Sequence, residues 1–225
     1  WAFATTGVSH SVLFKKIGDH VAGLASLDSF NSQNLSSTAW AYATGRLSHR
    51  RLFEKLVTEA AVLKDDFVQT QHIANFLWAC STVGYTDERQ FSTFAPVIAV
   101  KLAQCNEQGL ANIGWAYSVA IVPSQDLFNG CFTRAYASRQ SAFSDEGLAQ
   151  LHQWQLWQQE LKSGIELPLP LQEKCRMSFI STSHSESKLQ NDVVRELKAA
   201  GFDLDEEVLL GSGYRIDALV KVGDG

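Results

Sequence analysis

The chain has 225 residues, of which 45% are hydrophobic and only four are proline, so it can build a sizeable core in one or two domains. Its 19 basic and 24 acidic residues give a formal net charge of −5, which excludes a globally positive surface that attracts polyanions. Its four cysteines occur singly, which predicts reduced thiols in an intracellular compartment. No apolar run is long enough to span a membrane. We expect any targeting segment to lie upstream of Trp1.

A tryptophan-centred motif occurs four times along the chain. Trp1, Trp40, Trp78 and Trp115 are 39, 38 and 37 residues apart and begin the sequences WAFA, WAYA, WACS and WAYS. Each Trp is followed after thirteen positions by a phenylalanine, namely Phe14, Phe53, Phe91 and Phe128. Self-similarity at this period indicates helical hairpins that bury their apolar faces by stacking. We therefore predict an all-α solenoid of about 38-residue repeats over residues 1–160, with the Trp and Phe columns in its core.

Within each unit the pattern predicts a helix, a turn and a second helix. Apolar residues in the segment 52–63 recur with helical spacing. The residues predicted to cap the second helices are Ser9, Ser48, Thr86 and, in the fourth unit, Pro123-Ser124. The turn glycines are predicted at Gly7, Gly45 and Gly84. A fifth, degenerate unit has Gln153 where Trp is expected, with Trp154 and Trp157 displaced, and is predicted to cap the stack.

One position of the first helix is polar in every unit. Its residues are Ser37, Asn75, Asn112 and Gln150, and a small residue precedes each of them. One hydrogen-bonding side chain per repeat is what a modular reader of single-stranded RNA requires, because an unstacked base exposes its Watson–Crick edge. A solvated helix face would give the same pattern, and the sequence alone leaves both explanations open.

Basic side chains gather near the starts of the first two second helices. They are Lys15, Lys16, His49, Arg50, Arg51 and Lys55, and we predict that they contact RNA phosphates. An ordinary solvated helix face is again the alternative. Residues 1–160 as a whole carry 11 basic and 13 acidic side chains, a net of −2, which is unusual for an RNA-binding surface.

The repeat resembles that of the octatricopeptide repeat proteins, which are organellar RNA-binding α-solenoids. Their signature is similar to N-L-x-x-x-x-W-A-x-A-x-x-G, which NLSSTAWAYATG at residues 34–45 matches closely. HIANFLWACSTVG at 72–84 and GLANIGWAYS at 109–118 match well. The resemblance covers residues 1–160 and implies single-stranded or ribosomal RNA as the ligand, ribosomal or other assembly proteins as partners, and a mitochondrial location, with the plastid as the alternative.

The character of the sequence changes after residue 160. Pro168, Pro170 and a Ser/Thr cluster predict a linker over residues 161–187. Residues 188–202 predict an amphipathic helix, and EEVLL, GSG and YRIDALV predict two strands joined by a turn. Residues 188–225 resemble the opening part of a RAP domain, a module with a restriction-endonuclease-like core. That resemblance implies a metal-binding role for Asp217, but a second acidic strand residue is not present, and Asp224-Gly225 fits a loop better.

Three functions are compatible with these patterns. The first is a non-catalytic organellar RNA-binding protein, and we expect neither a cofactor nor a resident metal. The second is a protein-binding α-solenoid scaffold within a large assembly, which the near-neutral charge favours. The third is a metal-dependent nuclease, which rests on Asp217 and fold analogy alone. The family resemblance favours the first function.

Overall fold

The computed structural model describes residues 2–6, 10–67, 69–182 and 188–221, and the described part of the chain is mostly helical. Some predicted features lie outside these residues: Trp1, Gly7 and Ser9, the end of the predicted linker at 183–187, and the predicted loop at Asp224-Gly225. The elements are α1 (Ala2–Thr5), α2 (Ser11–Gly23), α3 (Ser32–Thr44), α4 (Arg50–Val62), η1 (Lys64–Asp66), α5 (Thr70–Thr82), α6 (Glu88–Lys101), η2 (Leu102–Gln104), α7 (Glu107–Ala120), α8 (Gly130–Ala137), α9 (Asp145–Glu160), α10 (Leu169–Thr182), α11 (Lys188–Ala199), β1 (Leu204–Leu209) and β2 (Arg215–Val220).

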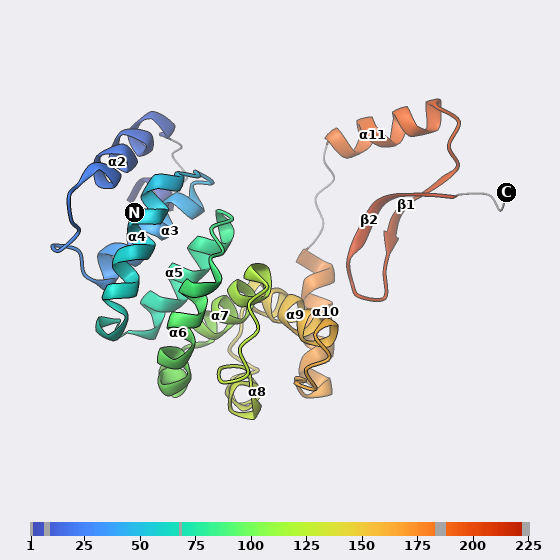
Figure 1. Cartoon of the computed structure of the whole chain (residues 1–225). Coiled ribbons are helices and arrows are strands. Elements are labelled where there is room, and N and C mark those ends of the chain that lie inside the picture. The colour runs from blue at the N-terminus through green and yellow to red at the C-terminus, as the bar shows by residue number, and fades with distance from the viewer. Residues whose placement is uncertain (1, 7–9, 68, 183–187, 222–225) are drawn as a thin grey trace.

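The helices up to α10 form successive hairpins that lie side by side (Figure 1). The first helices α1, α3, α5, α7 and α9 pack on one another in sequence order and form one layer, which we call the first-helix layer. The second helices α2, α4 and α6 pack on their neighbours along the outside of that layer. No strand occurs among the described residues before 161, so the prediction of an all-helical segment is confirmed.

The phenylalanine column lies in the core, as predicted. Phe14, Phe53, Phe91 and Phe128 are between 0% and 7% exposed. Two buried tyrosine hydroxyls tie first helices to this column in the preceding hairpin: Tyr42 donates to the carbonyl oxygen of Phe14 at 2.6 Å, and Tyr117 donates to that of Phe91 at 2.7 Å. A buried hydrogen bond of this kind fixes the register of one hairpin against the next.

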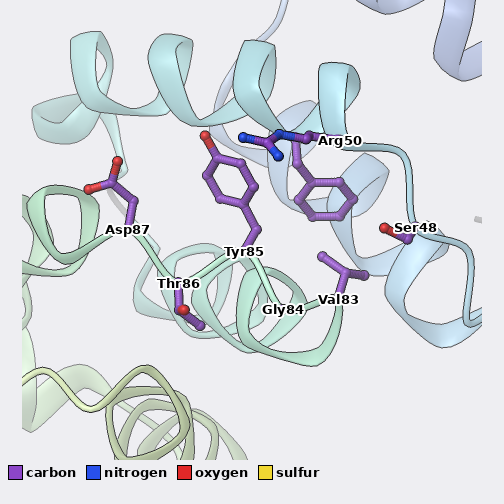
Figure 2. A pocket seen from close by; sticks show the side chains of 8 residues that line it. Ser48, Arg50, Val83, Gly84, Tyr85, Thr86 and Asp87 are labelled. Atoms are coloured by element: carbon purple, nitrogen blue, oxygen red, sulfur yellow. The ribbon is translucent and has the colours of Figure 1, made fainter.

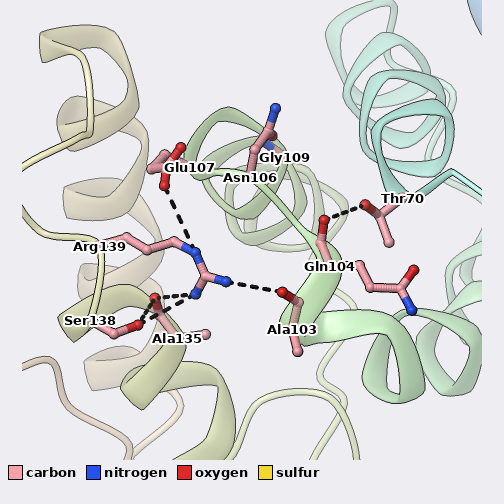
Figure 3. Close-up of polar contacts among 9 residues, drawn as sticks. All are labelled: Thr70, Ala103, Gln104, Asn106, Glu107, Gly109, Ala135, Ser138 and Arg139. Carbon is pink, nitrogen blue, oxygen red and sulfur yellow. Dashed lines mark hydrogen bonds and ion pairs between the residues drawn. The ribbon is translucent and has the colours of Figure 1, made fainter.

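Basic side chains of the outer segments also join successive hairpins. Lys55 donates to the carbonyl oxygens of Leu24 and Ala25 at 2.7 and 3.0 Å. The same type of contact, to a loop carbonyl of the preceding hairpin, is made by Lys101 to Phe67, by Arg139 to Ala103 and by Lys174 to Gln140. Figure 3 shows the Arg139 guanidinium between the carbonyl of Ala103 and the carboxylate of Glu107. These cations therefore cap loop carbonyls that would otherwise lack a protein donor.

Several predicted helix starts are wrong by one residue or more. The side chain that caps α4 is His49 rather than Ser48, and α6 is capped by Asp87 rather than Thr86. In the fourth hairpin the second helix begins only at Gly130, after the Asn129 cap, because the segment around Pro123-Ser124 forms a turn. At the turn after α3 the left-handed residue is Arg46, with a φ of 53°, and not the predicted turn glycine Gly45. At the turn after α5 the predicted turn glycine Gly84 has a positive φ of 75°.

The predicted linker is wrong for residues 169–182, which form helix α10. Leu171, Cys175 and Phe179 are buried on α10, and this helix packs extensively along α9. The two prolines stand at the start of the helix, where the first-turn N–H groups have no intrahelical acceptor, so they favour helix initiation instead of preventing it. The degenerate fifth unit is thus a complete hairpin made of α9 and α10.

The C-terminal unit consists of α11 and the antiparallel pair β1–β2, close to the predicted elements. Val208 pairs with Ile216, and Leu204 pairs with Val220. The turn between the strands contacts the end of the helical stack: the ring Nε2 of His152 lies 2.7 Å from the carbonyl oxygen of Ser212, and the rings of Phe179 and Tyr214 meet edge to face at 4.9 Å. None of the described helices is both long and apolar enough for a transmembrane segment.

Candidate nucleic-acid interface

The predicted slot lies on one outward stripe of the first-helix layer. In α3, α5 and α7 an amide residue precedes the slot by four positions and a tryptophan follows it by three, and this spacing places all three on one helix face. We call this surface the amide–tryptophan stripe, and its residues are Gln33, Ser37, Trp40, Gln71, Asn75, Trp78, Gln108, Asn112, Trp115, Gln150 and Gln153. None of these side chains is charged. Within α3, α5, α7 and α9, all of which the structure describes in full, there is no Lys or Arg.

The amides of the stripe bond to one another across the helices. Asn112 Nδ2 donates to Asn75 Oδ1 at 3.5 Å, and Gln150 Nε2 donates to Asn112 Oδ1 at 3.3 Å. Within the helices, Gln71 donates to Asn75 at 2.7 Å and Gln108 donates to Asn112 at 2.9 Å. These contacts form a ladder in which Asn112, only 6% exposed, is the central link. Ser37, Asn75 and Gln150 are half-buried. Asn112 is thus held inside the protein, contrary to the prediction of an open reading position.

The tryptophan column lies at the edge of the core, so the prediction that it belongs to the core is right only in part: Trp78 and Trp115 pack against the core but are not fully buried. Trp40, Trp78 and Trp115 are half-buried because they share the outward helix face with the slot. The rings of Trp78 and Trp115 lie 6.4 Å apart between centroids and are inclined by 38°. The indole of Trp115 donates to Gln153 Oε1 at 2.7 Å, and Gln153 Nε2 donates to the Tyr214 hydroxyl at 3.3 Å.

In α9 the tryptophan moves by one residue and becomes core. Trp154 has no exposed surface and packs against Tyr136 and Phe128. It fits because Gly114 lies opposite, where a Cβ would be 2.6 Å from the Tyr136 hydroxyl and 3.2 Å from Cγ of Trp154. The one-residue displacement leaves Gln153 on the stripe and closes the core at this end of the stack.

The predicted phosphate-binding residues lie on α2 and α4, outside the first-helix layer. Two of them have structural roles: His49 caps α4 and lies 3.2 Å from Asp19, and Lys55 holds loop carbonyls. Lys15 and Arg50 are exposed and pair with Asp19 and Glu54 at 2.7 and 2.9 Å. Lys16 and Arg51 are exposed. The structure therefore does not bring the predicted basic group together with the slot.

Several hollows border the described hairpins, among them one beside α4 and one beside α9. The first, of ≈ 400 Å³, lies between the start of α4 and the loop 83–87, and Figure 2 shows Arg50, Tyr85 and Asp87 around it. Its charges are mixed, because the Asp87 carboxylate stands on the same rim as Arg50. The second, of ≈ 560 Å³, lies between the ends of α7 and α9 and the turn before β2. Val119, Trp157 and Tyr214 line it, and it continues the stripe beyond Gln153.

A few titratable groups in the stack are buried. Burial raises the pKa of the Cys80 and Cys175 thiols to about 12, and that of the Tyr42 hydroxyl to about 12. Thiols of this kind stay protonated at neutral pH and are poor nucleophiles. Burial also lowers the pKa of His152, which therefore favours the neutral imidazole beside Ser212.

Asp217 lies exposed on β2. Among the residues that the structure describes, no three His, Cys, Asp or Glu side chains are grouped closely enough to hold a metal ion. The residues that the sequence reasoning missed are the amides four positions before the slot, and Gln153, His152 and Tyr214 at the contact with the C-terminal unit. The recurrence of Gln33, Gln71 and Gln108 at that offset was a signal that could have revealed part of the ladder.

No model of a known protein family matches the chain, and no curated protein sequence matches it.

Proposed function

We propose that this protein is a non-catalytic RNA-binding α-solenoid of the octatricopeptide repeat type, with the amide–tryptophan stripe as its RNA-binding face. The motif resemblance at residues 34–45, 72–84 and 109–118 supports the family, and the stacked hairpins agree with the fold expected of it. The proposal includes an organellar location, mitochondrial rather than plastid, and ribosomal RNA as one candidate ligand. In such a setting, ribosomal or other assembly proteins are the expected partners.

The observation that carries this proposal is the composition of the stripe. Single-stranded RNA is bound through unstacked bases, which need aromatic faces to stack on and amides or hydroxyls to hydrogen-bond. The stripe presents both kinds of side chain on α3, α5 and α7, three first helices that are adjacent in space. The exposed cations Lys16 and Arg51 lie on α2 and α4, away from the stripe, so the support for this proposal comes from the aromatic and amide side chains of the stripe.

We also propose that the C-terminal unit is the beginning of a RAP domain. The helix, the two strands and the sequence YRID at 214–217 support this assignment. Its turn packs on α9 and α10 through Ser212 and Tyr214, so the unit lies at the end of the stripe and offers a second surface for RNA or protein. A nuclease function is a weaker candidate, because it would rest on Asp217 alone.

A protein-binding scaffold is the second candidate, and the absence of Lys and Arg from α3, α5, α7 and α9 favours it. Crosslinking of the native protein in cells, followed by sequencing of bound RNA and identification of bound proteins, distinguishes the two. The proposal predicts enrichment of a defined set of organellar transcripts or ribosomal RNA. Recovery of protein partners without RNA above background would contradict it and favour the scaffold.

A further inference from the structure

We infer that the tryptophan row Trp40, Trp78 and Trp115, extended by Tyr214, is a base-stacking platform, and that the neighbouring amides position this row instead of reading bases. This inference rests on the proposed RNA-binding function and specifies how RNA is held: by stacking of its bases and not by hydrogen bonds from the slot residues. It assigns as ligand a flexible, unpaired strand that is held mainly through its base faces. Recognition of this kind depends on unstacked bases and tolerates most sequences.

The first step is the exposure of the rings. Trp154 and Trp157 are 0% and 7% exposed, whereas the three tryptophans of the row are only half-buried. Partly buried indoles at the same position of three successive hairpins leave some apolar ring surface in water, which lowers the hydrophobic gain of folding. Trp78 and Trp115 pack against the core with part of their surface, and the part that stays in water on one face of successive hairpins is available to a ligand.

The second step is the geometry of the rings. Trp78 and Trp115 are 6.4 Å apart between centroids. A base between two parallel rings needs a gap of roughly 7 Å, twice the stacking spacing of about 3.4 Å, so the inclined rings would have to turn parallel and separate to admit one. A base can also stack on the part of either ring that stays in contact with water. Both modes use the flat apolar surface of the indole.

The third step is the use of the polar groups. The indole N–H of Trp115 is already bonded to Gln153, and Gln153 is bonded to the Tyr214 hydroxyl. The amides of Asn75, Asn112 and Gln150 are bonded to one another, and Asn112 is buried. Because the indole N–H of Trp115 is already bonded, a ligand at Trp115 would contact chiefly the aromatic ring.

The same arrangement favours RNA over an extended peptide as the occupant. Helical scaffolds that bind extended peptides need side-chain amides that are free to bond the peptide main chain, which has a donor and an acceptor at nearly every residue. Here Asn112 cannot play that part, because both its oxygen and its nitrogen are bonded within the ladder. The amide oxygens of Gln71 and Gln150 have no hydrogen-bond partner among the described residues, but both are buried and therefore do not face a ligand either. A surface with aromatic rings and few accessible amides suits nucleobases.

The C-terminal turn lengthens the platform. Tyr214 is 44% exposed, and its ring is fixed against Phe179. Together with Val119 and Trp157 it borders the hollow of ≈ 560 Å³ that follows Gln153. The row thus runs from α3 to the turn before β2, and the hollow offers a place for a terminal base.

The test measures binding of the full chain to three labelled oligonucleotides of equal length: oligoadenylate, oligouridylate and an abasic strand that keeps the phosphates and lacks the bases. We expect the affinity to be highest for oligoadenylate, lower for oligouridylate and lowest for the abasic strand, because purines offer the larger stacking surface. Replacing one stacking ring, in Trp78→Leu, should weaken oligoadenylate binding about 5- to 100-fold. Trp78→Phe should recover a large part of the affinity, and Phe202→Leu, which changes an exposed aromatic residue outside the row, should leave it unchanged.

The outcomes separate this inference from the proposed function. If no oligonucleotide binds to the wild-type chain, the proposed RNA-binding function is wrong. If all three strands bind equally, or if Trp78→Leu binds oligoadenylate as wild type while its circular dichroism and thermal melt show a folded protein, RNA is bound but not by stacking on this row. A Trp78→Leu protein that fails to fold is replaced by Tyr214→Leu, for which the same loss is expected.

Discussion

Replacing Gly114 by alanine tests how closely α7 approaches the end of the stack. The new Cβ would stand 2.6 Å from the Tyr136 hydroxyl and 3.2 Å from Cγ of Trp154, so both side chains must move. Overpacking of this kind costs about 1–3 kcal/mol. Loss of the hydrogen bond from Tyr136 to the carbonyl of Leu110, 3.0 Å in the native protein, adds about 1 kcal/mol. The gain in helix propensity from Gly to Ala offsets up to about 1 kcal/mol.

We therefore expect Gly114→Ala to destabilise the protein by about 1–3 kcal/mol, which lowers Tm by about 3–10 °C for a chain of this size. Thermal unfolding followed by circular dichroism measures this shift. Gly130→Ala is the matched control, because Gly130 is also helical and a Cβ there meets no atom within 4 Å. It should leave Tm unchanged or raise it slightly. If the two substitutions shift Tm in the same direction and by the same amount, the close packing of α7 against Tyr136 and Trp154 is refuted.

Four further predictions concern the core, the hairpin contacts, pH and catalysis. Trp154→Ala should cost about 3–5 kcal/mol in a denaturant melt, and Trp78→Ala clearly less, because Trp154 is fully buried and Trp78 is not; equal costs would contradict the partly buried position of Trp78. Tyr117→Phe should cost about 1 kcal/mol through the lost hydrogen bond to the preceding hairpin, and an unchanged free energy of unfolding would show that this bond contributes nothing. Burial lowers the pKa of His152, so the unfolded chain binds more protons than the folded one as the pH falls through 6.5. The Tm should therefore decrease from that pH down to the folded pKa, and the Tm of His152→Gln should decrease less. Equal decreases in Tm for the two proteins would assign the effect to other groups. The chain with Mg²⁺ or Mn²⁺ should leave labelled RNA intact, and cleavage that disappears in Asp217→Ala would contradict this.

The helical layers and the phenylalanine column could be predicted from the sequence because each unit repeats the same apolar spacing. The repeat spacing could not show that Phe53 is buried and Trp40 faces outward, because both residues recur at the same interval of about 38 residues. Only the angle of each position around its helix decides which of them faces the core, and Trp40 shares its angle with the polar Ser37. A large aromatic residue at a repeat position is therefore an incomplete argument for burial.

The contacts between hairpins were the least predictable part of the candidate site. The bond from Gln150 to Asn112 joins residues 38 positions apart, and its existence depends on how closely α7 and α9 approach. Helix α10 was missed because Pro168 and Pro170 were interpreted as linker residues, although the first turn of a helix accepts proline. Lys55 was assigned to RNA because its charge is visible in the sequence, whereas its carbonyl partners Leu24 and Ala25 are visible only in the folded protein.

The central claim is that RNA lies on the amide–tryptophan stripe, and ultraviolet crosslinking of the full chain to bound single-stranded RNA tests it most directly. Crosslinked peptides are identified by mass spectrometry after digestion. The account predicts that crosslinks concentrate on the peptides of α3, α5 and α7 that contain Trp40, Trp78 and Trp115, with a further site at Tyr214. Crosslinks confined to the second helices α4 and α6, with none on the first-helix layer, would contradict it.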